Sequence, residues 1–380
     1  MYAKYVGFSA KLVLEDGTIL DGIGFGYPTM KVGEVVFNTG MVGYTEALTD
    51  PSYAGQMLTL TYPMVGNYGV PSYDVKDEFG IPKYFEADHI QPKAFIIHEL
   101  SPYASHWSSV KTLDTWLYEE RIPGIYGIDT RELTKKLRVQ GVMMGVLKVS
   151  NDKIDDNELF NELKKNKRYD MINFVEEVST KEIKEYGVRD KDCVVLIDTG
   201  VKYSIIRNLL KLGYRVVTLP YNVTIDDVKR LKPKGVVLSN GPGDPKLCTE
   251  TIKLTKELLN YELPLLGICL GNQIMALAAN ATTYKLKYGH RGQNKPCMDN
   301  KGRVYVTSQN HGYCIEPRSL EGTNFDIWFK NVDDNTVEGI IDNEKPFIAV
   351  QFHPEASPGP YDCMFLFEIF AKLMKSGKHV

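Results

Sequence analysis

Strand and helix patterns alternate four times between residues 193 and 278, and this alternation constrains the fold more than any other feature. Each strand pattern is a nearly continuous run of Val, Ile and Leu, which is typical of strands covered on both faces. Four βα units in succession predict a parallel, doubly wound sheet with right-handed crossovers. The strands are expected at CVVLID (193–198), RVVTLP (215–220), GVVLSN (235–240) and LPLLGI (263–268), each followed by a helix. Four later strands are expected to extend or flank this sheet: VYVTSQ, FDIWF, VEGIID and FIAVQF. The last helix is expected at MFLFEIFAKLM.

Residues 1–150 follow a different, β-rich pattern that is often interrupted by Gly and Pro. Asp16-Gly17 stands between two alternating runs, and this arrangement predicts a β-hairpin. Three further patterns indicate strands at FIIHEL (95–100) and VMMGVLKV (142–149), and a helix that begins after Asp129 and ends at Gly141. The sequence therefore predicts a β-rich α/β domain ahead of the doubly wound one.

Residues 151–192 separate these two patterns. They contain 21 Asp, Glu, Lys or Arg residues among 42, and the remaining apolar residues are spaced for one or two exposed helices. A charged composition of this kind favours a solvated connecting segment. The predicted organisation is therefore an N-terminal domain at 1–150, a charged connecting segment at 151–192 and a C-terminal domain at 193–380.

The overall composition excludes several classes of protein. The 380 residues suffice for two or three domains, and a net charge of −3 gives no reason to expect binding to nucleic acid or to an anionic membrane. No apolar run approaches the roughly 18 residues of a membrane span, and no signal-type segment begins the chain, so a cytoplasmic protein is expected. The six cysteines form no CxxC pair, which argues against a zinc ribbon or a redox motif. Most of them are expected to be buried, free thiols.

One of these cysteines lies in an unusual context. Cys269 follows the strand LPLLGI, precedes a helix, and has Gly267 and Gly271 on either side. This G-x-C-x-G corner is the thiol counterpart of the G-x-S-x-G nucleophile elbow. The amino end of the following helix favours a thiolate, and the backbone N–H of Leu270 is placed to stabilise an oxyanion. Cys269 is therefore a candidate nucleophile, although inert packing is the usual role of a lone cysteine.

Two other strand ends supply groups that such a nucleophile needs. His353 follows FIAVQF, and Pro354 favours an extended backbone that turns Glu355 to the same side as His353. Cys269, His353 and Glu355 therefore form a candidate catalytic triad, in which the carboxylate fixes the tautomer of the imidazole. The loop SNGPGD (239–244) follows GVVL, and its backbone donors suit an anion or an oxyanion.

The motifs together resemble known families. GICLGNQ, SNGPGD and FHPEASPGP are similar to the class I (triad-type) glutamine amidotransferase domain, over about residues 193–380. FNTGMVGYTEALTDPSYAGQMLTLTYPMVGNYG (37–69) and GIDTRELTKKLR (127–138) resemble the small subunit of carbamoyl-phosphate synthase. GHRGQNKP (289–296) and SQNHGY (308–313) fit the same family, so the resemblance covers nearly the whole chain.

The resemblance implies hydrolysis of L-glutamine to glutamate and ammonia. Cys269 would form a γ-glutamyl thioester, His353 would transfer protons, and Glu355 would orient His353. The residues that the resemblance implies for glutamine binding are Ser52, Gly241, Gly243, Leu270, Gln273, Asn310, Gly312 and Tyr313. Two positions depart from the family pattern: Asn272 stands where histidine is frequent, and Tyr313 where phenylalanine is common.

The family's partner is a large synthetase subunit that receives ammonia through a tunnel and uses ATP and bicarbonate to make carbamoyl phosphate for pyrimidine and arginine biosynthesis. No cofactor or metal is expected in this chain, because it has no P-loop motif and no clustered metal ligands. ATP and its metal are expected on the large subunit. Three alternatives are weaker. A sister amidotransferase such as the anthranilate synthase glutaminase, or a stand-alone hydrolase, leaves residues 1–150 unexplained, and a non-catalytic subunit leaves the intact triad unexplained.

Overall fold

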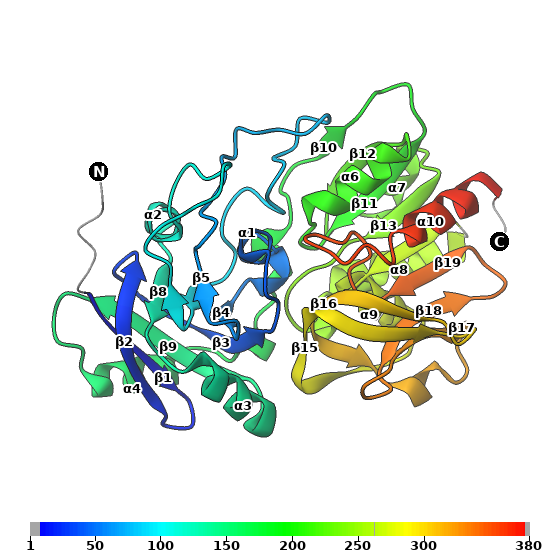
Figure 1. Ribbon diagram of the computed structural model, residues 1–380. Coiled ribbons are helices and arrows are strands. Elements are labelled where there is room, and N and C mark those ends of the chain that lie inside the picture. Colours follow the sequence, from blue (N-terminus) through cyan, green and yellow to red (C-terminus); the bar gives the residue numbers. More distant parts are fainter. Residues whose placement is uncertain (1–7, 262, 377–380) are drawn as a thin grey trace. The chain divides into compact units, whose positions relative to one another are not determined.

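The computed structural model describes residues 8–261 and 263–376 (Figure 1). The chain forms two compact units that divide between Ile172 and Asn173. Each unit has its own sheet and its own core.

The first unit is built on a closed barrel, drawn in blue to green in Figure 1. Around the barrel the strands are β1 (Phe8–Leu14), β2 (Ile19–Gly26), β8 (Pro123–Tyr126), β6 (Ala94–Ile96), β4 (Gln56–Leu60), β3 (Met30–Asn38) and β9 (Met143–Ser150). Its helices are α1 (Tyr44–Leu48), α2 (Leu113–Glu119), α3 (Thr130–Gln140) and α4 (Asp156–Lys165), with 3-10 turns at Pro51–Tyr53 and Tyr169–Met171. Aromatic side chains, with Trp116, Phe85 and Phe95 among the largest, fill the core.

Several local predictions for this unit are confirmed. β1 and β2 form an antiparallel hairpin, and Gly17 at its turn has a φ of 90°, a conformation that glycine adopts without strain. The Asp129 side chain accepts a hydrogen bond from the Glu132 amide (2.8 Å) at the start of α3, which ends before Gly141. β9 closes the barrel by pairing with both β1 and β3.

The strand predicted at FIIHEL is broken in the structure. β6 ends at Ile96, and residues Glu99–Leu100 form a separate strand, β7, that pairs with β5 (Met64–Val65). His98 lies at the break, where its Nδ1 atom is 2.7 Å from the Ile128 carbonyl oxygen. The side chain of His98 is thus tied to the segment before α3 at the point where the chain leaves the barrel.

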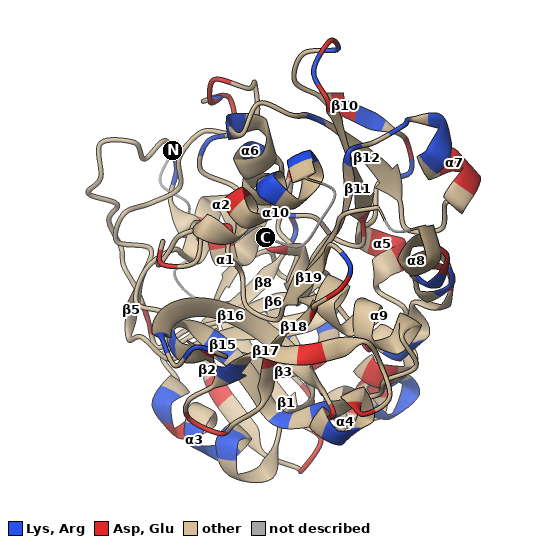
Figure 2. Ribbon diagram, turned by 90° about the vertical axis from the view of Figure 1, so that its right-hand side faces the viewer, with Lys and Arg blue, Asp and Glu red and all other residues tan. Residues whose placement is uncertain are grey.

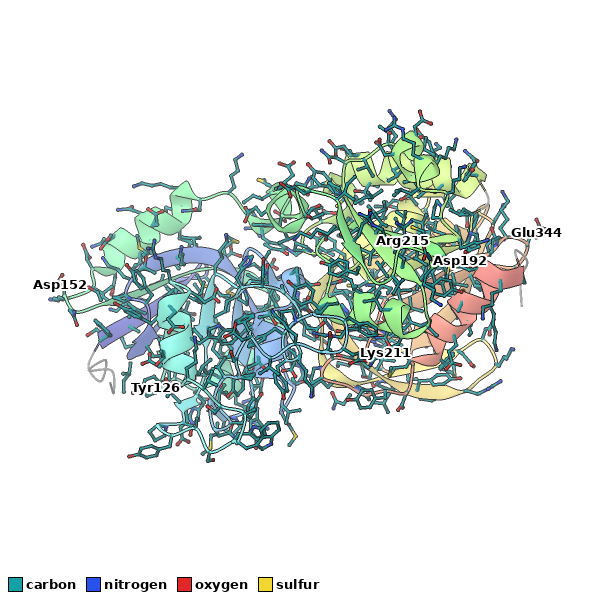
Figure 3. All side chains as sticks on the ribbon, turned by 90° about the horizontal axis from the view of Figure 1, so that it is seen from above. Tyr126, Asp152, Asp192, Lys211, Arg215 and Glu344 are labelled. Carbon is teal, nitrogen blue, oxygen red and sulfur yellow. The ribbon has the colours of Figure 1, made fainter. Side chains whose placement is uncertain are left out.

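Residues 151–192 are shared between the two units. α4 packs against the barrel, where Leu159 and Ile154 join Val13 and Val146 in one apolar cluster. After the unit boundary come α5 (Val175–Val178) and β10 (Lys184–Tyr186), and β10 pairs antiparallel with β12 (Arg215–Pro220). The Arg215 guanidinium, labelled in Figure 3, lies 3.1 Å from the Glu185 carboxylate and ties this edge strand to the sheet.

The second unit is a ten-stranded sheet with helices around it. In spatial order its strands are β10, β12, β11 (Cys193–Asp198), β13 (Gly235–Leu238), β14 (Leu265–Ile268), β19 (Phe347–Val350), β18 (Val337–Asp342), β17 (Phe325–Asn331), β15 (Thr283–Asp299) and β16 (Val304–Ile315). The helices are α6 (Tyr203–Lys211), α7 (Ile225–Arg230), α8 (Thr249–Tyr261), α9 (Leu270–Ala278) and α10 (Phe365–Ser376), with 3-10 turns at Pro245–Leu247 and Pro317–Leu320.

The parallel sheet predicted from the βα alternation is confirmed. β11 pairs in parallel with β12 and β13, β13 with β14, and β14 with β19. The later strands β18, β17, β15 and β16 continue the sheet in antiparallel fashion. Because β11, β13, β14 and β19 run in the same direction, their carboxyl ends meet at one edge, where α/β proteins place their sites.

Both signs of charge are mixed on α3, α4 and α7 (Figure 2). Mixed charges of this kind are typical of solvated helix faces. Among residues 8–261 and 263–376, no helix is long and apolar enough to span a bilayer.

Candidate active site

Cys269 occupies a strained corner between β14 and α9. Its φ is 54° and its ψ is −101°, a backbone conformation that non-glycine residues rarely adopt. The flanking glycines allow the corner to form. A Cβ atom on Gly267 would lie 2.7 Å from the Gly271 carbonyl oxygen, and one on Gly271 would lie 2.2 Å from the Leu238 carbonyl oxygen. The G-x-C-x-G spacing therefore allows the strand and the helix to approach closely behind the thiol.

The thiol itself is enclosed and faces polar groups. Cys269 is 2% exposed. Its Sγ atom lies 3.7 Å from the Asn310 carbonyl oxygen and 3.8 Å from Nε2 of Gln351. It also stands at the amino end of α9, where the helix dipole is positive. This position, after a strand and at the start of a helix, is the one that a nucleophile elbow gives to its nucleophile.

His353 and Glu355 lie together in the loop after β19. Nδ1 of His353 and Oε1 of Glu355 are 2.6 Å apart, and both side chains are buried. The carboxylate fixes Nδ1 as the protonated nitrogen and leaves Nε2 for the thiol. Burial alone lowers the pKa of His353, but the negative charges of Glu355 and Cys269 outweigh burial and raise it. The arrangement therefore favours an imidazolium beside the sulfur.

Lys202 is a site residue that the sequence analysis missed. It follows β11 at the start of α6, and its Nζ atom lies 2.9 Å from Oε1 of Glu355 and 3.3 Å from the Ser357 carbonyl oxygen. Both partners in this ion pair are buried. Burial raises the pKa of Glu355, but the charges of Lys202 and His353 outweigh burial and lower it to about 2. The only sequence signal was its position at the carboxyl end of a predicted strand.

We expect Lys202→Met to destabilise the folded chain by about 3 kcal/mol at pH 7, because it leaves a buried carboxylate without its main cation. A lowered pKa stabilises the fold above the unfolded-state pKa of Glu355, and that contribution is lost as the pH falls through the folded-state value. The difference in the free energy of unfolding between wild type and Lys202→Met should therefore become smaller as the pH falls from 5 to 3. Urea unfolding across this range measures it. Lys211→Met, at an exposed position on the same helix (Figure 3), is the matched control.

Several predicted glutamine-binding residues lie close to the thiol in the chain or in the structure. Leu270 is the first residue of α9, and Nε2 of Gln273 donates to the Tyr313 carbonyl oxygen (2.8 Å) and to Oε1 of Gln351 (3.0 Å). Asn310, Gly312 and Tyr313 are near neighbours on β16. The Asn310 carbonyl oxygen contacts the thiol, and Gln273 bonds to Tyr313, so β16 and α9 are held together beside Cys269.

The loop after β13 comes close to the amino end of α9. A Cβ atom on Gly241 would lie 2.0 Å from the Thr199 carbonyl oxygen and 2.7 Å from Cδ2 of Leu270. Gly243 has a φ of 92°, which glycine tolerates best. Gly241 therefore approaches the end of α9 through its backbone, as an oxyanion donor requires.

Ser52 belongs to the first unit, whereas the other predicted site residues belong to the second. It lies in a 3-10 turn in which the Asp50 side chain accepts a hydrogen bond from the Ser52 amide (2.9 Å). Its contribution to glutamine binding stays a prediction.

Comparison with known proteins relates both units to one family. The family described as glutamine amidotransferase class-I matches residues 195–373, and the family described as carbamoyl-phosphate synthase small chain, CPSase domain, matches residues 12–147. The carbamoyl phosphate synthase small chain of Pyrococcus furiosus is 47% identical over 97% of this chain and 98% of its own length. The chain belongs to the carbamoyl phosphate synthase small-chain family. The resemblance described from the sequence motifs is thereby confirmed, and the chain is the glutamine amidotransferase subunit of such an enzyme.

Other relatives show two arrangements of the carbamoyl phosphate synthase small chain. The small chain of Methanopyrus kandleri is 45% identical over 96% of this chain and 99% of its own length. The multifunctional protein CAD of Squalus acanthias is 46% identical over 97% of this chain, but the match covers only 16% of that protein. The same unit thus occurs both as a separate chain and as one part of a much longer polypeptide.

Proposed function

We propose that this small chain hydrolyses L-glutamine to glutamate and ammonia, with Cys269 as the nucleophile. The observation that carries the proposal is the arrangement of three charged, buried side chains, His353, Glu355 and Lys202, beside a thiol in a strained elbow. Such an arrangement combines an activated nucleophile, a proton-transfer group and an orienting carboxylate.

The first half of the reaction forms a thioester. The Cys269 sulfur attacks the side-chain carbonyl carbon of glutamine, and His353 holds the proton released by the thiol. The imidazolium then donates this proton from Nε2 to the amide nitrogen, which leaves as ammonia while the carbon–nitrogen bond breaks. During attack the carbonyl oxygen becomes negative, and the backbone N–H groups of Leu270 and Gly241 are the proposed donors that stabilise it.

The second half releases glutamate. His353 removes a proton from water, and the resulting hydroxide attacks the thioester carbon. The carbon–sulfur bond breaks and the thiolate returns to the elbow. Glu355 keeps the imidazole in the tautomer that both halves need, and Lys202 keeps Glu355 ionised. In this scheme Lys202 acts through Glu355 and does not touch the substrate.

Glutamine recognition is proposed for backbone groups around the elbow. The proposed contacts in the second unit are Gly241, Gly243, Leu270, Gln273, Asn310, Gly312 and Tyr313, and Ser52 of the first unit is proposed from the family resemblance alone. Gln273 is held by Tyr313 and Gln351, and Asn310 contacts the sulfur through its backbone, so these groups have little freedom to rearrange. Rigid placement of this kind lowers the entropy lost when the substrate binds.

We further propose that the ammonia passes to a large synthetase subunit, for carbamoyl phosphate used in pyrimidine and arginine biosynthesis. Two facts support this partner. The relatives that match over their full length are named small chains, and a relative of similar identity carries the same unit inside a longer multifunctional protein. ATP and its metal ion would be bound by the partner. A complex of this kind is expected to work in the cytoplasm.

We expect the isolated chain to be a poor glutaminase that its large subunit activates. Hydrolysis without an acceptor for ammonia wastes glutamine, and a site that needs its partner to reach productive geometry avoids that loss. Glutamate release should be measured for the chain alone and for the complex with ATP and bicarbonate. Equal turnover by the chain alone and by the complex would contradict the proposed activation by the large subunit. No turnover in either would point to a non-catalytic subunit.

The first unit is the proposed docking surface. Tyr103, Trp107 and Val110, in the loop between β7 and α2, are 73%, 83% and 60% exposed. Exposed large apolar side chains are frequent anchors of interfaces. We therefore expect Trp107→Ala to raise the Kd for the large subunit on the order of tenfold or more. Tyr361→Ala, at a similarly exposed aromatic residue of the second unit, is the control. A larger rise in Kd for Tyr361→Ala than for Trp107→Ala would place the docking surface on the amidotransferase domain instead.

A further inference from the structure

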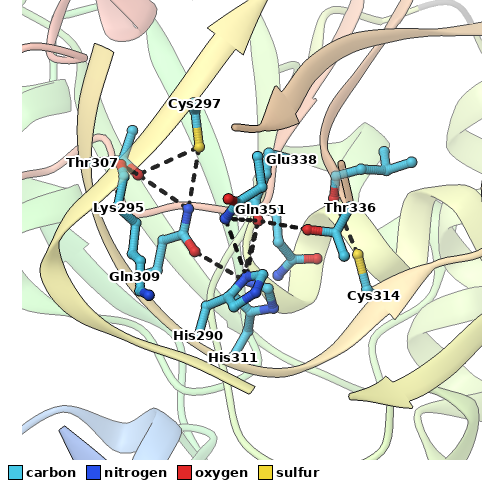
Figure 4. A network of polar contacts seen from close by, with 12 residues as sticks. His290, Lys295, Cys297, Thr307, Gln309, His311, Cys314, Thr336, Glu338 and Gln351 are labelled. Atoms are coloured by element: carbon cyan, nitrogen blue, oxygen red, sulfur yellow. Dashed lines mark hydrogen bonds and ion pairs between the residues drawn. The ribbon is translucent and has the colours of Figure 1, made fainter. Parts of the chain in front are cut away.

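A second polar cluster is formed by side chains from the antiparallel strands of the second unit, and none of its residues takes part in the proposed reaction. His290 on β15, His311 on β16 and Glu338 on β18 converge there, and all three are buried (Figure 4). Nδ1 of His290 lies 3.2 Å from Oε1 of Glu338, and Nε2 of His311 lies 3.6 Å from the same oxygen. One candidate ligand atom from each residue lies within 4.8 Å of the other two.

These separations match the dimensions of a metal centre. Zinc bonds of about 2.0–2.1 Å to nitrogen and oxygen place neighbouring tetrahedral ligands roughly 3.4 Å apart. The two distances to Oε1 of Glu338 lie on either side of that value. An ion bound to Oε1 of Glu338 can therefore approach both histidine nitrogens.

The hydrogen bonds of both histidines leave the correct nitrogens for a metal. Nδ1 of His311 lies 2.9 Å from the Tyr313 carbonyl oxygen, which only accepts, so Nδ1 carries the proton and Nε2 has a lone pair. Nε2 of His290 lies 2.8 Å from Oδ2 of Asp334, which makes Nδ1 the nitrogen that faces Glu338. A histidine whose outer nitrogen donates to a carboxylate or a carbonyl is the usual form of a metal ligand.

A neighbouring amide supports the same tautomer of His290. Oδ1 of Asn331 accepts from the Asp333 amide, so its NH₂ group faces the cluster. This NH₂ group lies 3.4 Å from Nδ1 of His290 and 3.3 Å from Oε1 of Glu338. The amide therefore donates to Nδ1 of His290 and to Oε1 of Glu338, and each of these atoms has a lone pair. The same lone pairs can bind a metal ion when the amide is displaced.

Gln309 is placed to complete a four-ligand centre. Its Oε1 atom lies 3.4 Å from Nε2 of His311. Its NH₂ group is held by Sγ of Cys297 (3.2 Å) and Oγ1 of Thr307 (3.1 Å), as Figure 4 shows, and this fixes the oxygen toward the cluster. An amide oxygen together with two imidazoles and a carboxylate is a donor set that borderline divalent ions accept.

The charge of the cluster also favours a cation. Two carboxylates contact the ring of His290: Oδ2 of Asp334 lies 2.8 Å from Nε2, and Oε1 of Glu338 lies 3.2 Å from Nδ1. Within the described part of the chain, Oε2 of Glu338 is buried and has no hydrogen-bond partner. A divalent ion with two neutral histidines would balance both carboxylates.

We propose that His290, His311 and Glu338 bind a divalent transition-metal ion of the Zn²⁺ class, with Gln309 as the fourth ligand and Asp334 as the carboxylate that orients His290. The ion joins three strands of the sheet. His311 stands between Asn310 and Gly312 on β16, so the ion also fixes the strand that carries proposed glutamine contacts. Binding of the ion does not depend on the proposed function, and it can be measured without substrate.

The test uses the full chain, stripped of metal with a chelator and titrated with Zn²⁺ by calorimetry and thermal unfolding. We expect one equivalent to bind and to raise Tm. Glu338→Gln should raise the Kd by more than 100-fold, and Asp334→Asn by about 10- to 100-fold because it removes only an orienting carboxylate. His106→Asn, at an exposed histidine of the other unit, should leave the Kd unchanged.

Two further measurements keep the outcome decisive. Cys269→Ser should bind Zn²⁺ as wild type does, which separates this site from binding at the nucleophile. If Glu338→Gln does not fold, Asp334→Asn alone decides, because the Asp334 side chain is 40% exposed and asparagine keeps an oxygen that can accept from Thr336. No bound equivalent, or equal Kd values for wild type and Asp334→Asn, would show that the cluster is a metal-free ion-pair network.

Discussion

Replacing Cys269 by Ser is expected to abolish glutamine hydrolysis and to leave glutamine binding close to that of wild type. The neutral hydroxyl of serine is a far weaker nucleophile than the sulfur of cysteine. Serine has nearly the same size and can occupy the same backbone position, so the binding groups around it should not move. Glutamate release and calorimetric binding of glutamine measure the two effects separately.

The matched control for this prediction is Cys248→Ser. Cys248 is also a free, buried thiol of the second unit, but burial raises the pKa of Cys248 to about 12, so it stays protonated. Its replacement should preserve turnover. A glutamine-like electrophile should label Cys269 in wild type and label nothing in the Cys269→Ser variant. Labelling of another cysteine, or retained turnover by the serine variant, would contradict the assignment.

The strand ends that carry the triad could be predicted from the sequence because of local constraints. Continuous Val, Ile and Leu runs indicate the parallel strands, and glycines two residues from Cys269 on either side are typical of a tight strand-to-helix turn. In a parallel sheet the residues after each strand share one edge, so the sequence predicts that Cys269 and His353 lie at the same edge.

Lys202 could not be assigned in this way. It precedes Glu355 by 153 residues, and in the sequence a lysine after a strand is indistinguishable from an ordinary exposed lysine. Its role depends on β11 lying beside β13, and on a loop that turns Glu355 back toward α6. Pairings between distant segments of this kind are set by tertiary packing, which residue patterns do not encode.

The cluster of His290, His311 and Glu338 was missed for a related reason. Its members lie on three strands, and the pairing of β15 with β16 contains irregularities on either side of His290 that shift the register. Spacing along the chain does not reveal side chains that converge from separate strands. Likewise, the closed barrel of the first unit depends on β9 pairing with both β1 and β3, a long-range choice that alternation alone does not make.

Replacing His353 by Asn is expected to lower kcat for glutamine hydrolysis by about 10²–10⁴-fold, the usual contribution of a general acid–base group. Asparagine keeps a polar side chain of similar reach but cannot carry a proton from the thiol to the leaving nitrogen. Removing Glu355 should have a smaller effect on kcat, because the imidazole remains and loses only its orienting partner. Rates at saturating glutamine compare His353→Asn with Glu355→Gln.

The pH dependence of the free energy of unfolding gives an independent check on the roles of His353 and Glu355. The pKa of His353 is raised in the fold, to about 10, so its ionisation stabilises the protein fully below the unfolded-state pKa, near 6.5, and this contribution is lost as the pH rises toward 10. The stability difference between wild type and His353→Asn should therefore shrink from pH 6 to pH 10. Glu355→Gln keeps an oxygen that can accept from Lys202, which limits the disturbance around that buried cation. If Glu355→Gln were as inactive as His353→Asn while still folded at pH 7, the carboxylate would have to take part in proton transfer itself, and the proposed division of roles would be wrong.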